Sequence, residues 1–154
     1  MNKAYILKTL KDVFNGQPWY GLAITELLKR VDPTTINQKT GKASSIAEIL
    51  EHTLSWHIFT IEMMKGNLDF DIEINSETDW KNNTYNPKDY QNLVTKFNHT
   101  QTELLALIEA KTGENWLLEQ VPNRTYDFTF LLNGTIQHDI YHIGQIVLLT
   151  KMYG

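Results

Sequence analysis

Two histidines stand four residues apart near the end of the chain, in a segment that otherwise has the pattern of an apolar helix. They are His138 and His142, between Gly134 and Gln145. Four residues advance a helix by about 400°, so both imidazole rings leave the same face roughly 6 Å apart and could share one ion. This spacing predicts a divalent-metal site. Such a site needs at least one more protein ligand.

The third ligand must come from another helix, and three more histidines are available. His99 lies in a polar run and is expected to be a solvated surface residue. His52 and His57 both fall in a helix predicted over about 45–65. His57 projects onto the centre of the apolar stripe of that helix and His52 onto its flank, so periodicity slightly favours His57. The residues alone leave both open as ligands.

Composition limits the class of protein. The chain has 154 residues, 42% of them hydrophobic, which predicts one compact domain over 1–154. The net charge of −4 and the scattered 14 Lys and Arg residues argue against nucleic-acid binding. Because there is no Cys, a metal must rely on nitrogen and oxygen ligands. Neither a signal-peptide core nor a membrane-spanning apolar stretch is present, so we expect a cytoplasmic protein without membrane contact.

Hydrophobic periodicity predicts an all-α protein with long connecting loops. Ser45 and Glu48 have the spacing of a capping box. Residues 67–86 are expected to form a long ordered loop, with room for a short extended piece at 70–74. This arrangement predicts a four-helix bundle, which builds metal sites from side chains on facing helices. The expected helices cover 3–14, about 19 or 20 to 31, 45–65, 87–111 and 129–152.

The predicted helix over 129–152 is apolar on two sides. The stripe with the histidine pair contains Leu131, Thr135, His138, His142, Gln145 and Leu149. A second stripe, about 140° away, contains Ile136, Ile140, Ile143 and Val147. A helix with two apolar faces must be covered twice, so one face should meet the core and the other a second surface. We therefore expect a homodimer.

Several segments together resemble a known family. The run from Ser45 to Trp56, followed far downstream by the motif between Gly134 and Ile146, is similar to the DinB-like family of metal-dependent four-helix bundle proteins. The segment 18–21 before a helix and the pair Asp79-Trp80 in the long loop are similar as well. The resemblance covers most of the chain. Its specific part is the final motif.

The resemblance implies one divalent metal ion with three histidine ligands. It assigns them as His52, His138 and His142 and leaves His57 outside the ligand set. Three neutral imidazoles leave an open position on the ion, which is the arrangement of a catalytic site. Zinc and nickel suit imidazole best, and iron or manganese is also compatible with it.

Other residues are candidates for the surroundings of the ion. Glu48 lies one turn before His52, but the capping box already employs it. Gln145 shares the histidine stripe and Asp139 would have to reach sideways; both are candidates to orient a ligand histidine. The large aromatic residues are expected in the core or at an interface more than in a pocket. They are Trp56, Trp80, Trp116 and Tyr141.

Two classes of function follow. Relatives with this bundle include transferases that use a low-molecular-weight thiol, so the resemblance implies thiol transfer or metal-assisted hydrolysis of a small molecule. Candidate general acids and bases are Asp139, Tyr141 and the acidic loop residues from Asp69 to Asp79. The alternative is a non-catalytic metal-binding dimer in which the ion is structural. Direct DNA binding is disfavoured, because the chain is acidic and lacks a basic stripe.

Overall fold

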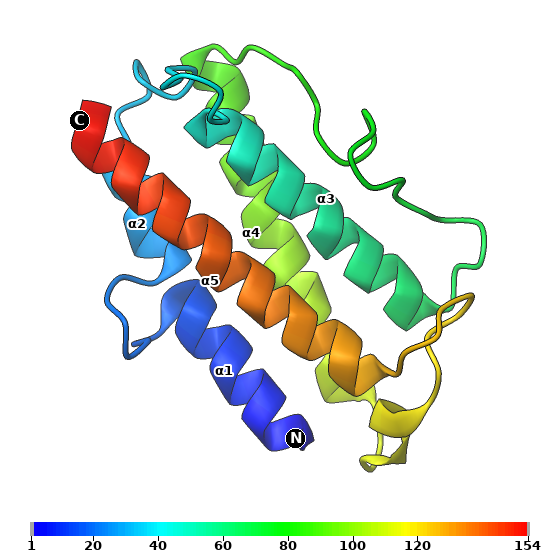
Figure 1. The fold of residues 1–154 in the computed structure, drawn as a ribbon. Helices are drawn as coiled ribbons and strands as arrows, with labels where there is room; N and C mark the ends of the chain where they lie inside the picture. Colours follow the sequence, from blue (N-terminus) through cyan, green and yellow to red (C-terminus); the bar gives the residue numbers. More distant parts are fainter. Residues whose placement is uncertain (1, 154) are drawn as a thin grey trace.

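Five α-helices and one short 3-10 helix build residues 2–153, the part of the chain that this computed structural model describes. Four long helices run along one another as a bundle, and α2 is short (Figure 1). The described residues contain no strand, and none of their helices is long and apolar enough to cross a bilayer. The predicted all-α bundle is confirmed. The elements are α1 (Lys3–Asn15), α2 (Ile24–Arg30), α3 (Ile46–Lys65), α4 (Pro87–Ala110), η1 (Asn115–Leu118) and α5 (Phe128–Tyr153).

Local capping signals set the ends of α3 and α4. The predicted capping box is present: the Ser45 hydroxyl accepts from the Glu48 N–H, and the Glu48 carboxylate accepts from the Ser45 N–H. Gly66 ends α3 in the left-handed conformation, with φ 77°, which glycine adopts at little cost. Asn86 caps α4, and Pro87 occupies its first turn, where its missing N–H is not needed.

The second helix is shorter than predicted. It begins at Ile24 and not at Trp19 or Tyr20. Gly21 has φ 137°, which a helix cannot contain, and its N–H bonds the Pro18 carbonyl in a turn. Trp19 is consequently outside any helix, and its side chain is fully exposed.

The long loop between α3 and α4 has no regular secondary structure, and residues 70–74, where there was room for a short extended piece, form no strand. Side-chain bonds hold the loop in place. The Asn37 amide donates to the Tyr85 carbonyl over 2.7 Å, and its oxygen accepts from the Tyr85 N–H. The loop runs beside α3 (Figure 1), and its Trp80 ring also reaches α5, with 6.0 Å between its centroid and that of the His142 ring. It therefore covers α3, the helix that carries His52.

The two apolar stripes predicted for α5 are mostly covered within the chain. Ile136 and Ile143 of the second stripe are buried, because α5 packs against α1 and α2 as well as α3. Ile140 of that stripe remains 37% exposed, and the other apolar residues that α5 leaves exposed lie elsewhere on the helix. They are chiefly Phe130, Tyr141, Leu148 and Met152, which we term the outer face of α5. The chain itself therefore supplies the second cover that was expected from a partner subunit.

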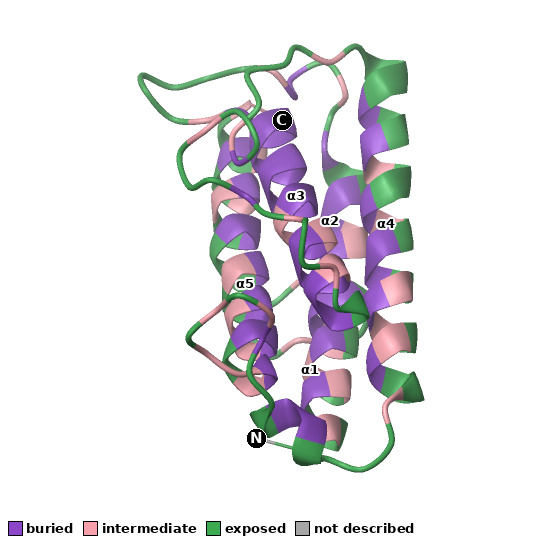
Figure 2. Cartoon of the chain, turned by 90° about the vertical axis from the view of Figure 1, so that its right-hand side faces the viewer, coloured by how far each residue is buried: buried purple, intermediate pink, exposed green. Residues whose placement is uncertain are grey.

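The centre of the bundle is α3, which packs against both α4 and α5. Buried residues occupy almost the whole of α3 but only the inner side of α4 (Figure 2). Leu50, Phe97 and Leu132 are fully buried, and each such side chain stabilises the fold by about 1.5–3 kcal/mol. Because α3 is surrounded, its polar residues must find partners inside the protein.

One set of these partners crosses three helices. His57 of α3 lies 2.7 Å from the Asp139 carboxylate of α5, and neither side chain is exposed. Gln101 of α4 donates its amide to the second carboxylate oxygen over 3.3 Å. The carboxylate thus joins α3, α4 and α5 at a point that water does not reach.

Removing this carboxylate should destabilise the bundle strongly. Asp139→Ala leaves the buried His57 donor without its acceptor and removes one acceptor of the Gln101 amide, and we expect it to lower the free energy of unfolding by about 3 kcal/mol or more. Glu103→Ala removes a surface partner of Lys65 and should cost at most about 1 kcal/mol. Urea unfolding followed by circular dichroism measures both. Equal losses in the two variants would contradict this account.

Candidate metal centre

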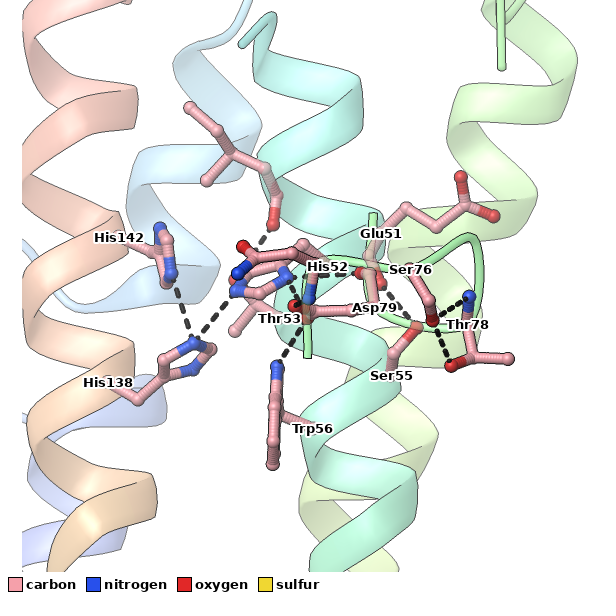
Figure 3. Close-up of polar contacts among 12 residues, drawn as sticks. Glu51, His52, Thr53, Ser55, Trp56, Ser76, Thr78, Asp79, His138 and His142 are labelled. Carbon is pink, nitrogen blue, oxygen red and sulfur yellow. Dashed lines mark hydrogen bonds and ion pairs between the residues drawn. The ribbon is translucent and has the colours of Figure 1, made fainter. Parts of the chain in front are cut away.

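Three imidazole rings meet between α3 and α5 (Figure 3). The Nε2 atom of His138 lies 2.9 Å from Nε2 of His52 and 3.0 Å from Nε2 of His142. Two zinc–nitrogen bonds at a tetrahedral angle hold their nitrogens about 3.3 Å apart. The three ligand atoms all lie within 4.8 Å of one another, so this group could hold one metal ion.

Hydrogen bonds on the far side of two rings determine which nitrogen carries the proton. The Nδ1 atom of His52 lies 3.1 Å from the main-chain carbonyl oxygen of Asp79 and 2.8 Å from the carboxylate of the same residue, and that of His142 lies 2.7 Å from the side-chain oxygen of Gln145. Both partners are acceptors, so both Nδ1 atoms are assigned the proton. The Nε2 lone pairs of His52 and His142 consequently point toward His138.

The third ring cannot satisfy both of these lone pairs. The Nε2 atom of His138 can donate one proton to His52 or His142 but not to both. At least one of the two lone pairs is therefore left without a donor, an arrangement that a shared cation relieves. The Nδ1 atom of His138 is buried and has no hydrogen-bond partner among the described residues.

The three rings are neutral at pH 7, which is the form that binds metals. Burial lowers the pKa of His52 and of His142 below the usual value of 6.5. The pKa of His138 is lowered to about 3, chiefly by burial and in addition by the neighbouring rings of His142 and His52. A cation therefore does not have to displace the extra proton of an imidazolium near neutral pH.

The other two histidines lie elsewhere. His99 is exposed, as its polar surroundings predicted. His57, which periodicity favoured, is bound to Asp139 in the core and does not reach the pair. The structure instead brings His52 to His138 and His142, as the family resemblance implied. A stripe position says which side of α3 a residue is on, but not which residue of α5 lies opposite it.

Of the proposed orienting residues, one is in place and one is not. Gln145 contacts His142 directly. Asp139 does not contact His138 or His142, because its carboxylate is used by His57 and Gln101. Glu48 serves the capping box, as expected, and also pairs with Lys39 over 2.6 Å.

Sequence reasoning did not assign the orienting role of Asp79. Its buried carboxylate contacts His52, accepts from the Trp56 indole N–H over 2.8 Å, and accepts from the Asn75 backbone N–H over 2.9 Å. The next residue, Trp80, stacks on the His52 ring with 3.8 Å between centroids and 9° between planes. The sequence feature that pointed to this role was the Asp79-Trp80 pair in an otherwise irregular loop.

A pocket of about 420 Å³ opens beside the three rings, with His52 and His138 in its lining. Trp56 and Trp80 line it as well, although aromatic residues were expected mainly in the core. Trp116 is buried against Phe128, as expected for an aromatic residue of the core. The Tyr141 ring contacts His142 from the exposed side of α5, with 4.9 Å between centroids.

The bundle and its three-histidine cluster define a helical protein with a site suited to a metal ion. The chain matches the model of the DinB superfamily over residues 23–146, and it belongs to that superfamily. The matched segment contains all three histidines of the cluster and the loop residue Asp79. No curated protein and no solved structure matches the chain.

The metal-free protein should lose stability as the pH falls below about 6.5. In the unfolded chain the histidines gain protons near their ordinary pKa of 6.5, whereas in the folded chain their pKa values are lowered. The unfolded state therefore binds more protons below that pH, and the free energy of unfolding falls by up to about 1.4 kcal/mol per pH unit for His138. Urea unfolding between pH 7.5 and 5 measures this slope. His138→Asn should reduce it, and an unchanged slope would contradict the assignment.

Proposed function

We propose that this protein binds one divalent metal ion through the Nε2 atoms of His52, His138 and His142, and acts as a metal-dependent transferase or hydrolase on a small molecule. Zinc or nickel is the expected ion, with iron or manganese as less favoured choices. The observation that carries the proposal is the convergence of the three Nε2 atoms. Asp79 and Gln145 support it, because they hold the protons of two rings on the opposite side.

Three protein ligands leave room for a fourth group. A divalent ion held this way offers a position to water, a thiol or a substrate atom and acidifies the proton of that group. The residues of the chain then have supporting roles. Asp79 holds His52 in its tautomer, Trp80 covers the face of the same ring, and the pocket supplies space for a substrate next to the cluster.

The candidate acids and bases of the chain are largely engaged. The Asp79 carboxylate is used by His52, Trp56 and Asn75, so it orients a ring and is not free to move a proton. Asp139 is enclosed in the core with His57. A low-molecular-weight thiol would bring its own nucleophile, so thiol transfer suits this centre better than a reaction that needs a protein base.

Metal analysis tests the site directly. Protein purified without a nickel column should contain about one equivalent of metal per chain, because three convergent imidazoles form a complete ligand set. His138→Ala should lose the metal. His99→Ala, which removes an exposed histidine outside the cluster, should retain it. Elemental analysis by mass spectrometry provides the measurement. A metal-free wild type whose stability does not change on adding zinc would overturn the proposal.

The cobalt-substituted protein separates an enzyme from a structural ion. If the fourth position is open, azide or a small thiol should change the visible absorption spectrum, since the ligand enters the coordination sphere. An unchanged spectrum would favour the alternative, a non-catalytic dimer with a structural ion.

We also propose that the protein is a homodimer that pairs through the outer face of α5. Phe130, Tyr141 and Leu148 each expose about three fifths of their side chains there. Exposed apolar residues that share one side of a helix are a common association surface. Two copies of α5 related by a two-fold axis would cover them mutually.

A charge on this face should separate the subunits. Light scattering after size exclusion should give twice the chain mass of 17.9 kDa for the wild type. Leu148→Arg should give the monomer mass, because a buried charge without a partner opposes association. Leu118→Arg is the matched control, since Leu118 is also exposed but lies in η1. A monomeric wild type, or the same mass for both variants, would contradict the dimer.

A further inference from the structure

The pocket beside the cluster is mainly apolar. Its lining comes from α3, α5 and the two loops that precede α4 and α5. Besides Trp80, the apolar part contains Trp56, Phe59, Ile74, Tyr126, Phe130 and Leu131. His52 and His138 belong to the same lining, so a molecule in the pocket lies next to their rings.

The polar side chains that the helices contribute to the pocket bond one another. The hydroxyls of Thr60 and Thr135 are 3.0 Å apart, and each also lies within donating distance of the backbone carbonyl four residues before it. The Trp56 indole N–H is given to Asp79. These groups therefore offer little to a ligand. The remaining polar residues, such as the exposed Asn75, come from the loops, where solvent reaches them.

The charge of the pocket lining also limits which ligands can bind. Asp79 is the charged side chain in the lining, and its carboxylate already has three partners. An anion in the pocket would lie near this carboxylate, and a cation would find no free counter-charge. Moving either from water into apolar surroundings without a partner is costly. The pocket is thus suited to a neutral group.

We propose that the pocket takes the neutral, apolar body of the substrate, with a size of one or two aromatic rings, and directs a single polar head toward the Nε2 atoms of His52 and His138. A cavity of about 150 Å³ holds benzene, so 420 Å³ has room for two fused rings. The position of the head rests on the proposed metal site. The binding of the body does not.

Gly134 allows the pocket to be filled selectively. It lines the pocket on α5, one turn before His138, and a Cβ added there meets no heavy atom within 4 Å. Cα–Cβ bonds in a helix tilt toward the N-terminus, so a larger side chain extends away from His138. Leucine would therefore occupy pocket space, and replacing a helical glycine also favours the helix by up to about 1 kcal/mol. Gly134→Ala gives the same helical gain with far less added volume.

Two hydroxamates with the same metal-binding head test the proposal on the zinc-loaded protein. Acetohydroxamate has almost no body, whereas 2-naphthohydroxamate carries two fused rings. By calorimetry, the naphthyl compound should bind the wild type more tightly by on the order of 30-fold, because its rings leave water. Gly134→Leu should abolish this gain and leave acetohydroxamate binding unchanged. Gly134→Ala should keep most of the gain.

The possible failures are distinguishable. Affinities for the two hydroxamates within about threefold of each other in the wild type, or a full naphthyl gain in Gly134→Leu, would overturn the proposed pocket. If the protein holds no zinc, the proposed function fails, and the pocket is tested with 2-naphthol on the metal-free, folded protein by fluorescence. Binding that Gly134→Leu loses and Gly134→Ala keeps would support the pocket. No binding to the wild type would overturn it.

Discussion

The register between α3 and α5 is the constraint on which the rest of this structure depends. Three polar contacts join these two antiparallel helices: His52 with His138, His57 with Asp139, and Thr60 with Thr135. The middle contact is wholly buried, so a shift of α5 by one turn, about 5.4 Å, would leave a carboxylate without its donors. The His57–Asp139 pair, which is not part of the candidate metal site, thereby fixes how the three histidines of that site lie relative to one another.

The long loop between α3 and α4 supplies the parts of the site that the helices do not. Asp79 holds the loop against α3 through its contacts with His52 and Trp56. Trp80 stacks on the His52 ring, which Asp79 orients. One short segment therefore determines the tautomer of a cluster ring and closes one side of the pocket. Loops carry such roles well, because a rigid bundle holds their ends. The outcome is a polar cluster at the margin of an apolar space, which is common in small-molecule sites.

Local sequence patterns predicted the parts of the fold that depend on neighbours in the chain. The capping box at Ser45 and the glycine after Lys65 define α3 without help from other elements. Where a turn intervened, periodicity failed: the φ of Gly21 delays α2 to Ile24. The second apolar stripe of α5 was read correctly as a surface needing cover, but composition could not say that α1 and α2 supply it.

By itself the sequence determined the helical class, the pairing of His138 with His142 and, through family resemblance, the choice of His52. Spacing along one helix is enough for the pair, since four residues return to the same face. Only the tertiary structure decided that His57 belongs to Asp139, that Asp79 orients His52, and that a pocket lies beside the cluster. Those contacts join residues more than 20 positions apart, and their partners depend on the register of packed helices and the path of a loop. Periodicity within one element carries no information about either.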